Sequence, residues 1–383
     1  MTFRKLVFWM HLVAGCVAGT VIFIMSITGA AIAYQRQIIS WLDRDFRVAP
    51  APARLPIEAM MARIVTENHA APSSITLHSD PSAPAEAGFG RNRILLIDPY
   101  TGHVLGESAP RVRAWFRTAE DWHRWLGADG QRRATARAIT GACNLAFFFL
   151  VVSGPFLWIP RRWSARNVRA IAFFRAAVSG RARDFNWHNV IGIWCAAPLA
   201  VIVFSGAVMS YPWANDLIFR LTGNDPPTAS QRGPERREDA TPTLAGIDLL
   251  WSAAEKQVPD WRSITLRLPS GRGPVTFSID TGDGGRPDQR AQLTLNRRTG
   301  EIVRWEPFSS YNSGRRLRSW LRFAHTGEAG GIVGQTIAGI ASTGAAILAI
   351  TGLSLAIRRL SRKFRRGNAV GAAGGESAAI ARD

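Results

Sequence analysis

Residues 7–35 read VFWMHLVAGCVAGTVIFIMSITGAAIAYQ, a stretch without a single charged side chain. Three further uncharged stretches cover residues 138–160, 185–215 and 329–357. Each is longer than the roughly 20 apolar residues needed to cross the hydrocarbon core of a bilayer. Gln-Arg-Gln follows the first stretch in place of a small-residue cleavage site, so we expect a membrane span there and not a cleaved signal peptide. The sequence therefore predicts four transmembrane helices.

Basic residues predict the orientation of these helices. The connection Arg161–Asp184 holds seven arginines and one aspartate, and Arg4, Lys5 and an arginine-rich segment after residue 357 flank the outermost spans. The two long loops are nearly balanced, with 13 basic and 11 acidic residues in 36–133 and 17 and 14 in 216–328. Because cytoplasmic loops carry the excess of Lys and Arg, we expect both termini in the cytoplasm and both long loops outside, in a periplasm. The formal net charge of +19 then reflects contact with membrane lipid and topology, not nucleic-acid binding.

The chain is internally duplicated. Equivalent landmarks recur at the same offsets in the first and third spans: His11 and His188, Gly15 and Gly192, Thr28-Gly29 and Ser205-Gly206, Tyr34 and Tyr211. The second and fourth spans correspond through Ser153-Gly154 and Thr351-Gly352. Unrelated helices would not share these offsets, so we predict two copies of one unit.

The long loops repeat as well. RILLIDPYTGHVLG (93–106) and AQLTLNRRTGEIVR (291–304) each predict a β-hairpin, with Gly102 and Gly300 supplying the positive φ of the turn. A helical pattern precedes each hairpin, at 57–69 and 244–257. Each loop is therefore expected to form a small α+β domain. The compositions of 80–90 and 223–243 predict mobile loops within these domains, and that of 367–383 predicts a disordered tail.

The expected fold is thus an α-helical membrane protein, a bundle of four transmembrane helices with two periplasmic α+β domains. The predicted segments are transmembrane helices at 1–35, 134–160, 185–215 and 329–360, outer domains at 36–133 and 216–328, a cytoplasmic loop at 161–184 and a disordered cytoplasmic tail at 361–383.

Four of the seven histidines stand where the predicted spans begin, namely His11, His123, His188 and His325. Ionisable residues at membrane depth are costly and usually functional, and imidazole is a common axial ligand of haem. The topology places His11 and His188 towards the cytoplasm and His123 and His325 towards the periplasm. Because two axial ligands must share one depth, we predict two bis-histidine b-type haems, held by His11 with His188 and by His123 with His325.

The surroundings of the histidines are consistent with non-covalent haem. The chain has no C-x-x-C-H motif, which excludes c-type attachment. Arg124 and Arg322 are candidate partners for the propionates of the outer haem, since guanidinium suits carboxylates. Nicotinamide and flavin fingerprints are absent as well. We therefore expect electrons to come from a cytoplasmic donor protein, a small reductant or a quinol.

Several motifs resemble those of the PepSY-associated transmembrane family: Trp9-Met10-His11 in the first span, Asp98-Pro-Tyr-Thr-Gly102 in the first outer loop and His325-Thr326-Gly327 before the last span. The resemblance extends from about residue 4 to 360. It implies that the outer domains are PepSY-like and that the protein is a di-haem oxidoreductase of iron uptake that reduces a ferric siderophore. Asn296 replaces the Asp98 equivalent in the second repeat, where either residue can accept hydrogen bonds in the turn.

Two other functions are compatible with parts of the sequence. A non-catalytic, membrane-anchored PepSY module that binds or regulates a partner would explain the outer domains but not the histidines in the spans. A transporter for the intact iron complex would explain the repeated halves, but the predicted spans lack interior acids and broken helices. Electron transfer through haem is the hypothesis that accounts for all four histidines.

Overall fold

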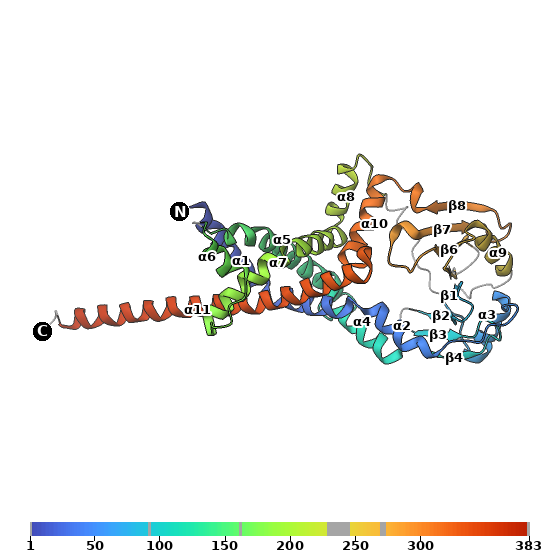
Figure 1. The fold of residues 1–383 in the computed structure, drawn as a ribbon, viewed down its shortest axis with the longest axis horizontal. Coiled ribbons are helices and arrows are strands. Elements are labelled where there is room, and N and C mark those ends of the chain that lie inside the picture. Colours follow the sequence, from blue (N-terminus) through green and yellow to red (C-terminus); the bar gives the residue numbers. More distant parts are fainter. Residues whose placement is uncertain (1, 91–92, 161–162, 228–245, 269–272, 381–383) are drawn as a thin grey trace. The chain divides into compact units, whose positions relative to one another are not determined.

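The computed structural model describes residues 2–90, 93–160, 163–227, 246–268 and 273–380 (Figure 1). It forms two compact units. The membrane unit comprises Met1–Ala31, Glu120–Ser210 and Thr336–Asp383, and the sheet unit comprises Ile32–Ala119 and Tyr211–Gln335. Each predicted repeat therefore contributes to both units.

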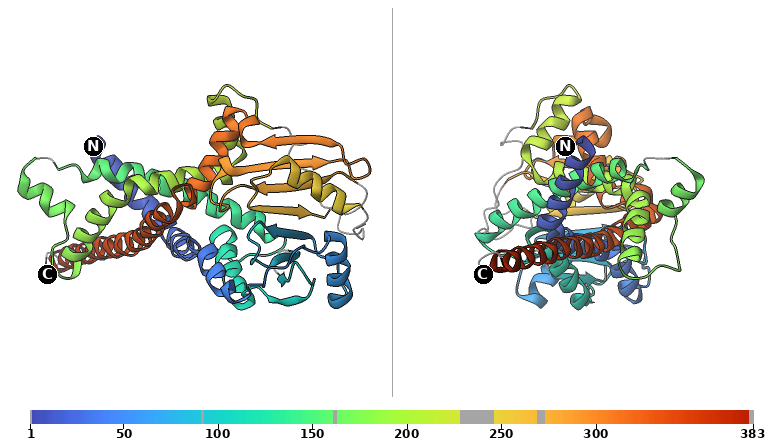
Figure 2. Two further views of the ribbon diagram at one scale, coloured as in Figure 1. Left: turned by 45° about the vertical axis from the view of Figure 1, so that its right-hand side comes forward. Right: turned by 90° about the vertical axis from the view of Figure 1, so that its left-hand side faces the viewer.

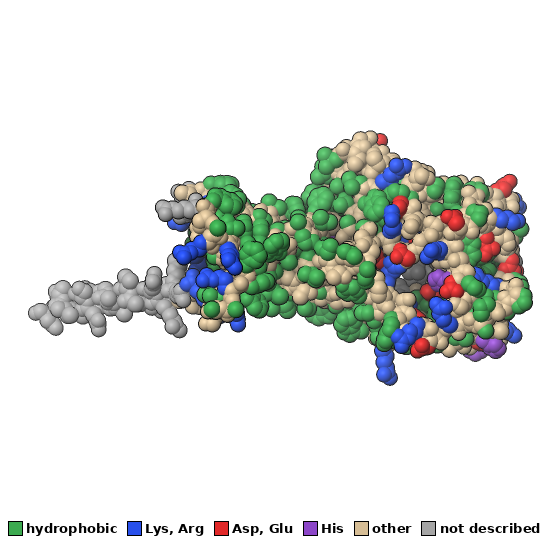
Figure 3. Space-filling view, viewed as in Figure 1, with side chains coloured by type: hydrophobic (Ala, Val, Ile, Leu, Met, Phe, Trp, Pro, Cys, Tyr) green, Lys and Arg blue, Asp and Glu red, His purple; other side chains and the backbone are tan. Residues whose placement is uncertain are grey.

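Among the described residues, four helices are long and apolar enough to cross a membrane. They are α1 (Phe3–Ile32), α5 (Arg132–Trp158), α7 (Gly180–Ser210) and α11 (Gly331–Ile380). Large apolar side chains such as Val17, Trp194 and Ile340 are exposed on them, and apolar side chains cover the visible face of the spans (Figure 3). Continuous exposed apolar surface of this kind is typical of contact with lipid. The chain is a multi-pass membrane protein, as predicted.

The four spans pack in the cyclic order α1, α5, α7, α11. Each neighbouring pair is joined by at least one contact: Phe3 with Phe156, Asn144 with the Val203 carbonyl, Cys195 with Gly344, and Gly19 with Leu353. Glycine permits the close approach at two of these contacts, as is common between membrane helices. A Cβ on Gly344 would lie 2.7 Å from the Cys195 sulfur. In this order α1 and α7 are each flanked by α5 and α11.

The sheet unit is built on one antiparallel sheet of eight strands, in the order β4-β3-β2-β1-β5-β6-β7-β8. The strands are β1 (Ser74–His78), β2 (Ala85–Phe89), β3 (Arg93–Ile97), β4 (Val104–Glu107), β5 (Ser263–Arg267), β6 (Val275–Asp280), β7 (Arg290–Leu295) and β8 (Ile302–Pro307). Each repeat supplies four consecutive strands. The halves join through β1 and β5, whose sequences SITLH and SITLR pair antiparallel with Thr76 opposite Thr265. The two predicted outer domains thus share one continuous sheet.

Helices α3 (Ile57–Asn68) and α9 (Ile247–Gln257) cover one face of this sheet (Figure 2). Their apolar sides pack on inward-facing strand residues such as Ile75, Leu266 and Phe277, all fully buried. The helix N-termini also stabilise each other. The Asp248 carboxylate accepts from the backbone N–H of Glu58 at 3.1 Å, and the Glu58 carboxylate accepts from that of Asp248 at 3.4 Å. This reciprocal contact is the counterpart of an N-cap, made between the two repeats.

The remaining helices complete the repeat. In the first half α2 (Gln35–Leu42) follows α1 and α4 (Pro110–Trp125) precedes α5, whereas in the second half α8 (Pro212–Leu221) follows α7 and α10 (Ser313–His325) precedes α11. Short helices lie at α6 (Ala165–Ala172), η1 (Asp43–Asp45), η3 (Pro287–Gln289), η4 (Phe308–Ser310) and η5 (Glu328–Gly330). Tyr34 and Tyr211, matched by sequence, are the residues before α2 and α8. The duplication predicted from sequence is therefore present throughout the fold.

Both predicted hairpin turns are confirmed. The Asp98 side chain accepts from the backbone N–H of Tyr100 at 2.8 Å, and Asn296 accepts from that of Arg298 at 2.9 Å. Gly102 and Gly300 have φ values of +75° and +73°, which glycine adopts without steric cost. The replacement of aspartate by asparagine keeps the acceptor and the turn.

One prediction of irregular structure is wrong. The expected mobile loop 80–90 contains β2, because Ala85 and Ala87 are small enough to fit in the core while their backbone pairs with β1 and β3. Helix α11 extends to Ile380, and the disorder expected for the tail from residue 361 stays a prediction. Residues 228–243 of the other predicted loop lie outside the described residues. The third span begins at Gly180, five residues before the predicted boundary.

Candidate functional site

Three of the four candidate histidines have the same environment. In each case Nδ1 lies within hydrogen-bonding distance of a Ser or Thr hydroxyl on another helix of the membrane unit, and a glycine follows that residue in the sequence. The pairs are His11 with Ser153 at 2.8 Å, His188 with Thr351 at 3.0 Å, and His123 with Thr28 at 3.2 Å. Three of the four Ser/Thr-Gly pairs that mark the repeat in the sequence thus supply the hydroxyl partners of these histidines.

The hydroxyl hydrogen bonds determine which imidazole nitrogen carries the proton. The Ser153 hydroxyl donates to the Phe149 carbonyl at 2.7 Å, and the Thr351 hydroxyl donates to the Ile347 carbonyl at 2.8 Å. A hydroxyl has one proton, so with that proton on the helix carbonyl each oxygen accepts from the imidazole. The neutral histidines are therefore protonated on Nδ1 and keep a lone pair on Nε2.

His123 follows the same rule with an additional acceptor. Its Nδ1 lies 2.8 Å from the Met25 carbonyl, and a carbonyl oxygen can only accept. The Thr28 hydroxyl donates to the Ile24 carbonyl at 2.6 Å. Nδ1 of His123 must therefore carry the proton, which again leaves Nε2 with the lone pair.

At two of the three pairs the glycine provides space for the imidazole ring. A Cβ on Gly29 would lie 3.1 Å from His123 Cε1, and one on Gly352 would lie 3.2 Å from His188 Cε1. At Gly154 the corresponding distance to His11 Cε1 is 3.9 Å, an ordinary contact. The hydroxyl residue thus supplies the acceptor, and the glycine lets the ring lie close to the helix backbone at two of the three places.

His11 and His188 have matching positions in the bundle. His11 is on α1 and contacts a hydroxyl of α5, and His188 is on α7 and contacts a hydroxyl of α11. That the two histidines share one depth and hold one haem stays a prediction.

The predicted partner of His123 lies in the other unit. His123 is near the C-terminal end of α4 in the membrane unit, and His325 is the last residue of α10 in the sheet unit. The pairing of His123 with His325 therefore stays a prediction. The Thr-Gly after His325 has a local role, because a Cβ on Gly327 would lie 2.5 Å from the Gly334 carbonyl oxygen.

The arginines predicted to bind propionates stack on aromatic rings. The Arg124 guanidinium lies 4.5 Å from the Trp125 ring centroid, and that of Arg322 lies 5.3 Å from the Phe323 centroid. At the end of the bundle that is predicted to be cytoplasmic, Arg4 donates to the carbonyls of Leu157 and Ile159, each at 2.7 Å. The role of Arg124 and Arg322 in binding a cofactor stays a prediction.

Sequence reasoning missed a buried carboxylate in α7. Asp184 is 5% exposed and accepts from the Ser354 hydroxyl at 2.9 Å, with Arg183 and Arg358 at 3.0 and 3.4 Å. It therefore joins α7 to α11 at the end of the bundle where both helices are rich in arginine. The available signal was its position as the one acidic residue among seven arginines in Arg161–Asp184.

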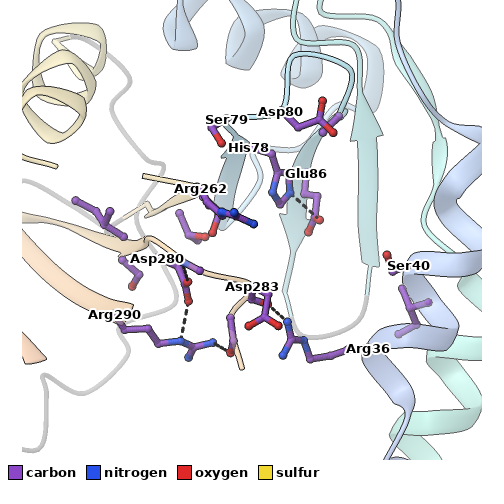
Figure 4. A pocket seen from close by; sticks show the side chains of 18 of the residues that line it. Arg36, Ser40, His78, Ser79, Asp80, Glu86, Arg262, Asp280, Asp283 and Arg290 are labelled. Atoms are coloured by element: carbon purple, nitrogen blue, oxygen red, sulfur yellow. Dashed lines mark hydrogen bonds and ion pairs between the residues drawn. The ribbon is translucent and has the colours of Figure 1, made fainter. Parts of the chain in front are cut away.

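Sequence reasoning also missed a cavity of about 1430 Å³ whose lining residues all belong to the sheet unit. Side chains from α2, β1, β2 and β7 lie around it, with Arg36, His78, Glu86 and Arg290 among them (Figure 4). The first and last of these residues, Arg36 and Arg290, are more than 250 positions apart in the sequence, so no local motif predicts the cavity.

The donor set fits non-covalent b-type haem. Bis-histidine ligation needs two neutral imidazoles that present Nε2 while Nδ1–H is held by an outer partner, and His11 with His188 meet the requirement on both sides. Among the described residues there is no group of three or more His, Cys, Asp and Glu side chains that could hold a bare metal ion. The histidines are thus the candidate ligands in the described part of the membrane unit.

Comparison with known families agrees with the motifs and the fold. The model of the PepSY-associated TM region matches residues 8–359, nearly the whole chain. Comparison with curated proteins finds no match. Because the matched region includes all four spans and both halves of the sheet, the chain belongs to the family of the PepSY-associated TM region.

Proposed function

We propose that this protein carries electrons across the bacterial inner membrane through two b-type haems and reduces a ferric siderophore in the periplasm. His11 and His188 would hold the inner haem, and His123 and His325 the outer one. The observation that carries the proposal is the repeated histidine environment, in which a Ser/Thr hydroxyl fixes the proton on Nδ1 of His11, His123 and His188.

A purely structural role for these histidines explains less. One histidine near a helix end often only bonds a neighbour or reaches the interface. Here the same hydroxyl-glycine pair recurs on three helices, and at Gly29 and Gly352 a side chain is omitted where the imidazole lies. Repetition of both the acceptor and the space is expected if each imidazole must hold one orientation. Outer partners of metal-binding histidines have this function.

The direction of electron flow follows from the predicted topology. Haem supplies a one-electron carrier at each of two depths, which suits a hydrocarbon core of about 30 Å. The protein residues hold the imidazoles neutral and oriented and exclude water from the bundle. With the arginine-rich ends in the cytoplasm, electrons would enter there or from a quinol and leave on the periplasmic side. Reduction of the acceptor to Fe(II) weakens its binding by hard oxygen ligands and releases the iron.

The test is haem quantification followed by an activity assay. Protein purified from haem-replete cells should contain two low-spin b-type haems per chain, and after reduction it should be reoxidised by a ferric siderophore with formation of Fe(II). A preparation without haem, whose His11→Ala and His188→Ala variants retain full biological function, would refute the proposal. That result would favour the alternative, a membrane-anchored PepSY module that binds or regulates a partner without catalysis.

A further inference from the structure

The large cavity of the sheet unit lies on the sheet face opposite α3 and α9. Side chains alternate along a strand, and in β5 Ile264 and Leu266 belong to the apolar core whereas Ser263, Thr265 and Arg267 line the cavity. A sheet face that packs against another layer is normally apolar. The central strands instead present hydroxyls and charges to a cavity that is partly open to solvent, which is typical of a binding surface.

Positive charge is in excess around this space. Nine arginines and five carboxylates line the cavity, which we call the arginine cavity. The arginines are Arg36, Arg44, Arg47, Arg113, Arg262, Arg267, Arg290, Arg318 and Arg322. They come from segments of both repeats, so the excess arises only when the eight-stranded sheet is formed.

The carboxylates already have partners in the protein. Asp280 pairs with Arg290 at 3.0 Å, Glu86 with His78 at 3.2 Å, and Asp80 with Arg47 at 3.7 Å. In the described part of the chain, by contrast, the guanidinium groups of Arg262 and Arg267 make no hydrogen bond or ion pair with another residue. Arg262 lies beside the same space as Arg36 and Arg290 (Figure 4). Two cationic groups at the ends of β5 are thus available to a ligand.

We propose that the arginine cavity binds a polyanionic ferric chelate whose carboxylates pair with Arg262 and Arg267. The inference rests on the proposed function in naming an iron chelate as the ligand. Guanidinium recognises carboxylate through two parallel hydrogen bonds, and a concave surface of one sign concentrates the field that attracts such a ligand. The volume of about 1430 Å³ exceeds the range of about 300–1,000 Å³ for drug-sized ligands, as a bulky chelate requires.

Binding is tested on the full-length protein in detergent, after measurement of its haem content. The probe is gallium citrate, which is anionic and redox-inert, and the comparison probe is a cationic gallium trihydroxamate. Calorimetry should detect gallium citrate binding that weakens with salt, and no comparable binding of the cationic chelate. Loss of one charged hydrogen-bonding group costs about 1.5–3 kcal/mol. Arg262→Gln and Arg267→Gln should therefore each weaken binding about tenfold to hundredfold.

Arg298→Gln is the matched control, because Arg298 is an exposed arginine of the sheet unit that does not line the cavity. It should bind gallium citrate like the wild type. Binding that is unchanged in the Arg262→Gln/Arg267→Gln double variant, or preference for the cationic chelate, would overturn the inference. If gallium citrate binds as expected but haem is absent, the proposed function fails and the polyanion site stands. If haem is present and the double variant reduces ferric citrate normally, the proposed function stands and the polyanion site fails.

Discussion

Replacing Thr351 with valine removes one oxygen from the neighbourhood of His188 while keeping the shape of the side chain. The Thr351 hydroxyl accepts from His188 Nδ1 at 3.0 Å and donates to the Ile347 carbonyl at 2.8 Å. In the variant the imidazole loses the acceptor that fixes its proton and its orientation. We therefore expect weaker haem binding at the site predicted for His11 and His188.

The size of the effect follows from two independent magnitudes. A buried donor left without its partner costs about 1–3 kcal/mol. Loss of an outer partner of a metal-binding histidine costs about 10–100-fold in affinity, which is about 1.4–2.8 kcal/mol at about 1.4 kcal/mol per factor of ten. The two ranges overlap, so haem should bind Thr351→Val about 10–100-fold more weakly at this site. Ser153→Ala should have a similar effect through His11.

The assay is the haem-to-protein ratio together with the rate of haem loss to an excess of apomyoglobin. Thr343→Val is the control, since the Thr343 hydroxyl also donates to a carbonyl of its own helix, that of Gly339 at 2.9 Å, but in the described part of the chain it makes no hydrogen bond with a histidine. It should keep both haems. Wild-type retention of both haems by Thr351→Val, or equal loss in Thr343→Val, would refute the reasoning.

Three further predictions concern other contacts. Gly352→Ala should perturb the haem spectrum, because its Cβ would lie 3.2 Å from His188 Cε1; an unchanged spectrum would contradict this. Asp248→Ala should destabilise the protein by about 1 kcal/mol in thermal unfolding through loss of the bond from the Glu58 N–H, whereas exposed Asp260→Ala should not. Burial alone would raise the pKa of Glu86, but the hydrogen bond with His78 and the charges of His78 and Arg113 hold it below the usual 4.5. The stabilisation is thus present above about pH 4.5 and lost as pH falls through the lower folded value, so the melting-temperature deficit of Glu86→Gln should shrink as the pH falls below about 4.5; a deficit that stays constant there would contradict it.

Hydropathy and the repeat predicted the four spans and both hairpin turns, because these features depend on local sequence. The continuous sheet depends on the pairing of β1 with β5, about 190 residues apart. Their near-identical sequences SITLH and SITLR were visible, but sequence identity does not specify that two segments pair with each other. Strand β2 was missed because Ala85 and Gly88 have low strand propensity and tertiary pairing determines their conformation.

The candidate site was likewise predicted only in part. The sequence identified His11 and His188 by their shared offset, and it identified the Ser/Thr-Gly pairs only as landmarks of the repeat. That Ser153 and Thr351 accept from these histidines depends on helix packing across the bundle. The arginine cavity was also beyond reach, since Arg36, Arg262 and Arg290 come together only in the folded sheet unit.

The most direct measurement is the optical spectrum with haem quantification for the wild type, His11→Ala, His188→Ala and His123→Ala. We predict two low-spin b-type haems per chain in the wild type. His11→Ala and His188→Ala should each lose the same haem and keep the other, and His123→Ala should lose the one that they keep. Haem-free wild-type protein from haem-replete cells would contradict the account, as would loss of the same haem in His11→Ala and His123→Ala.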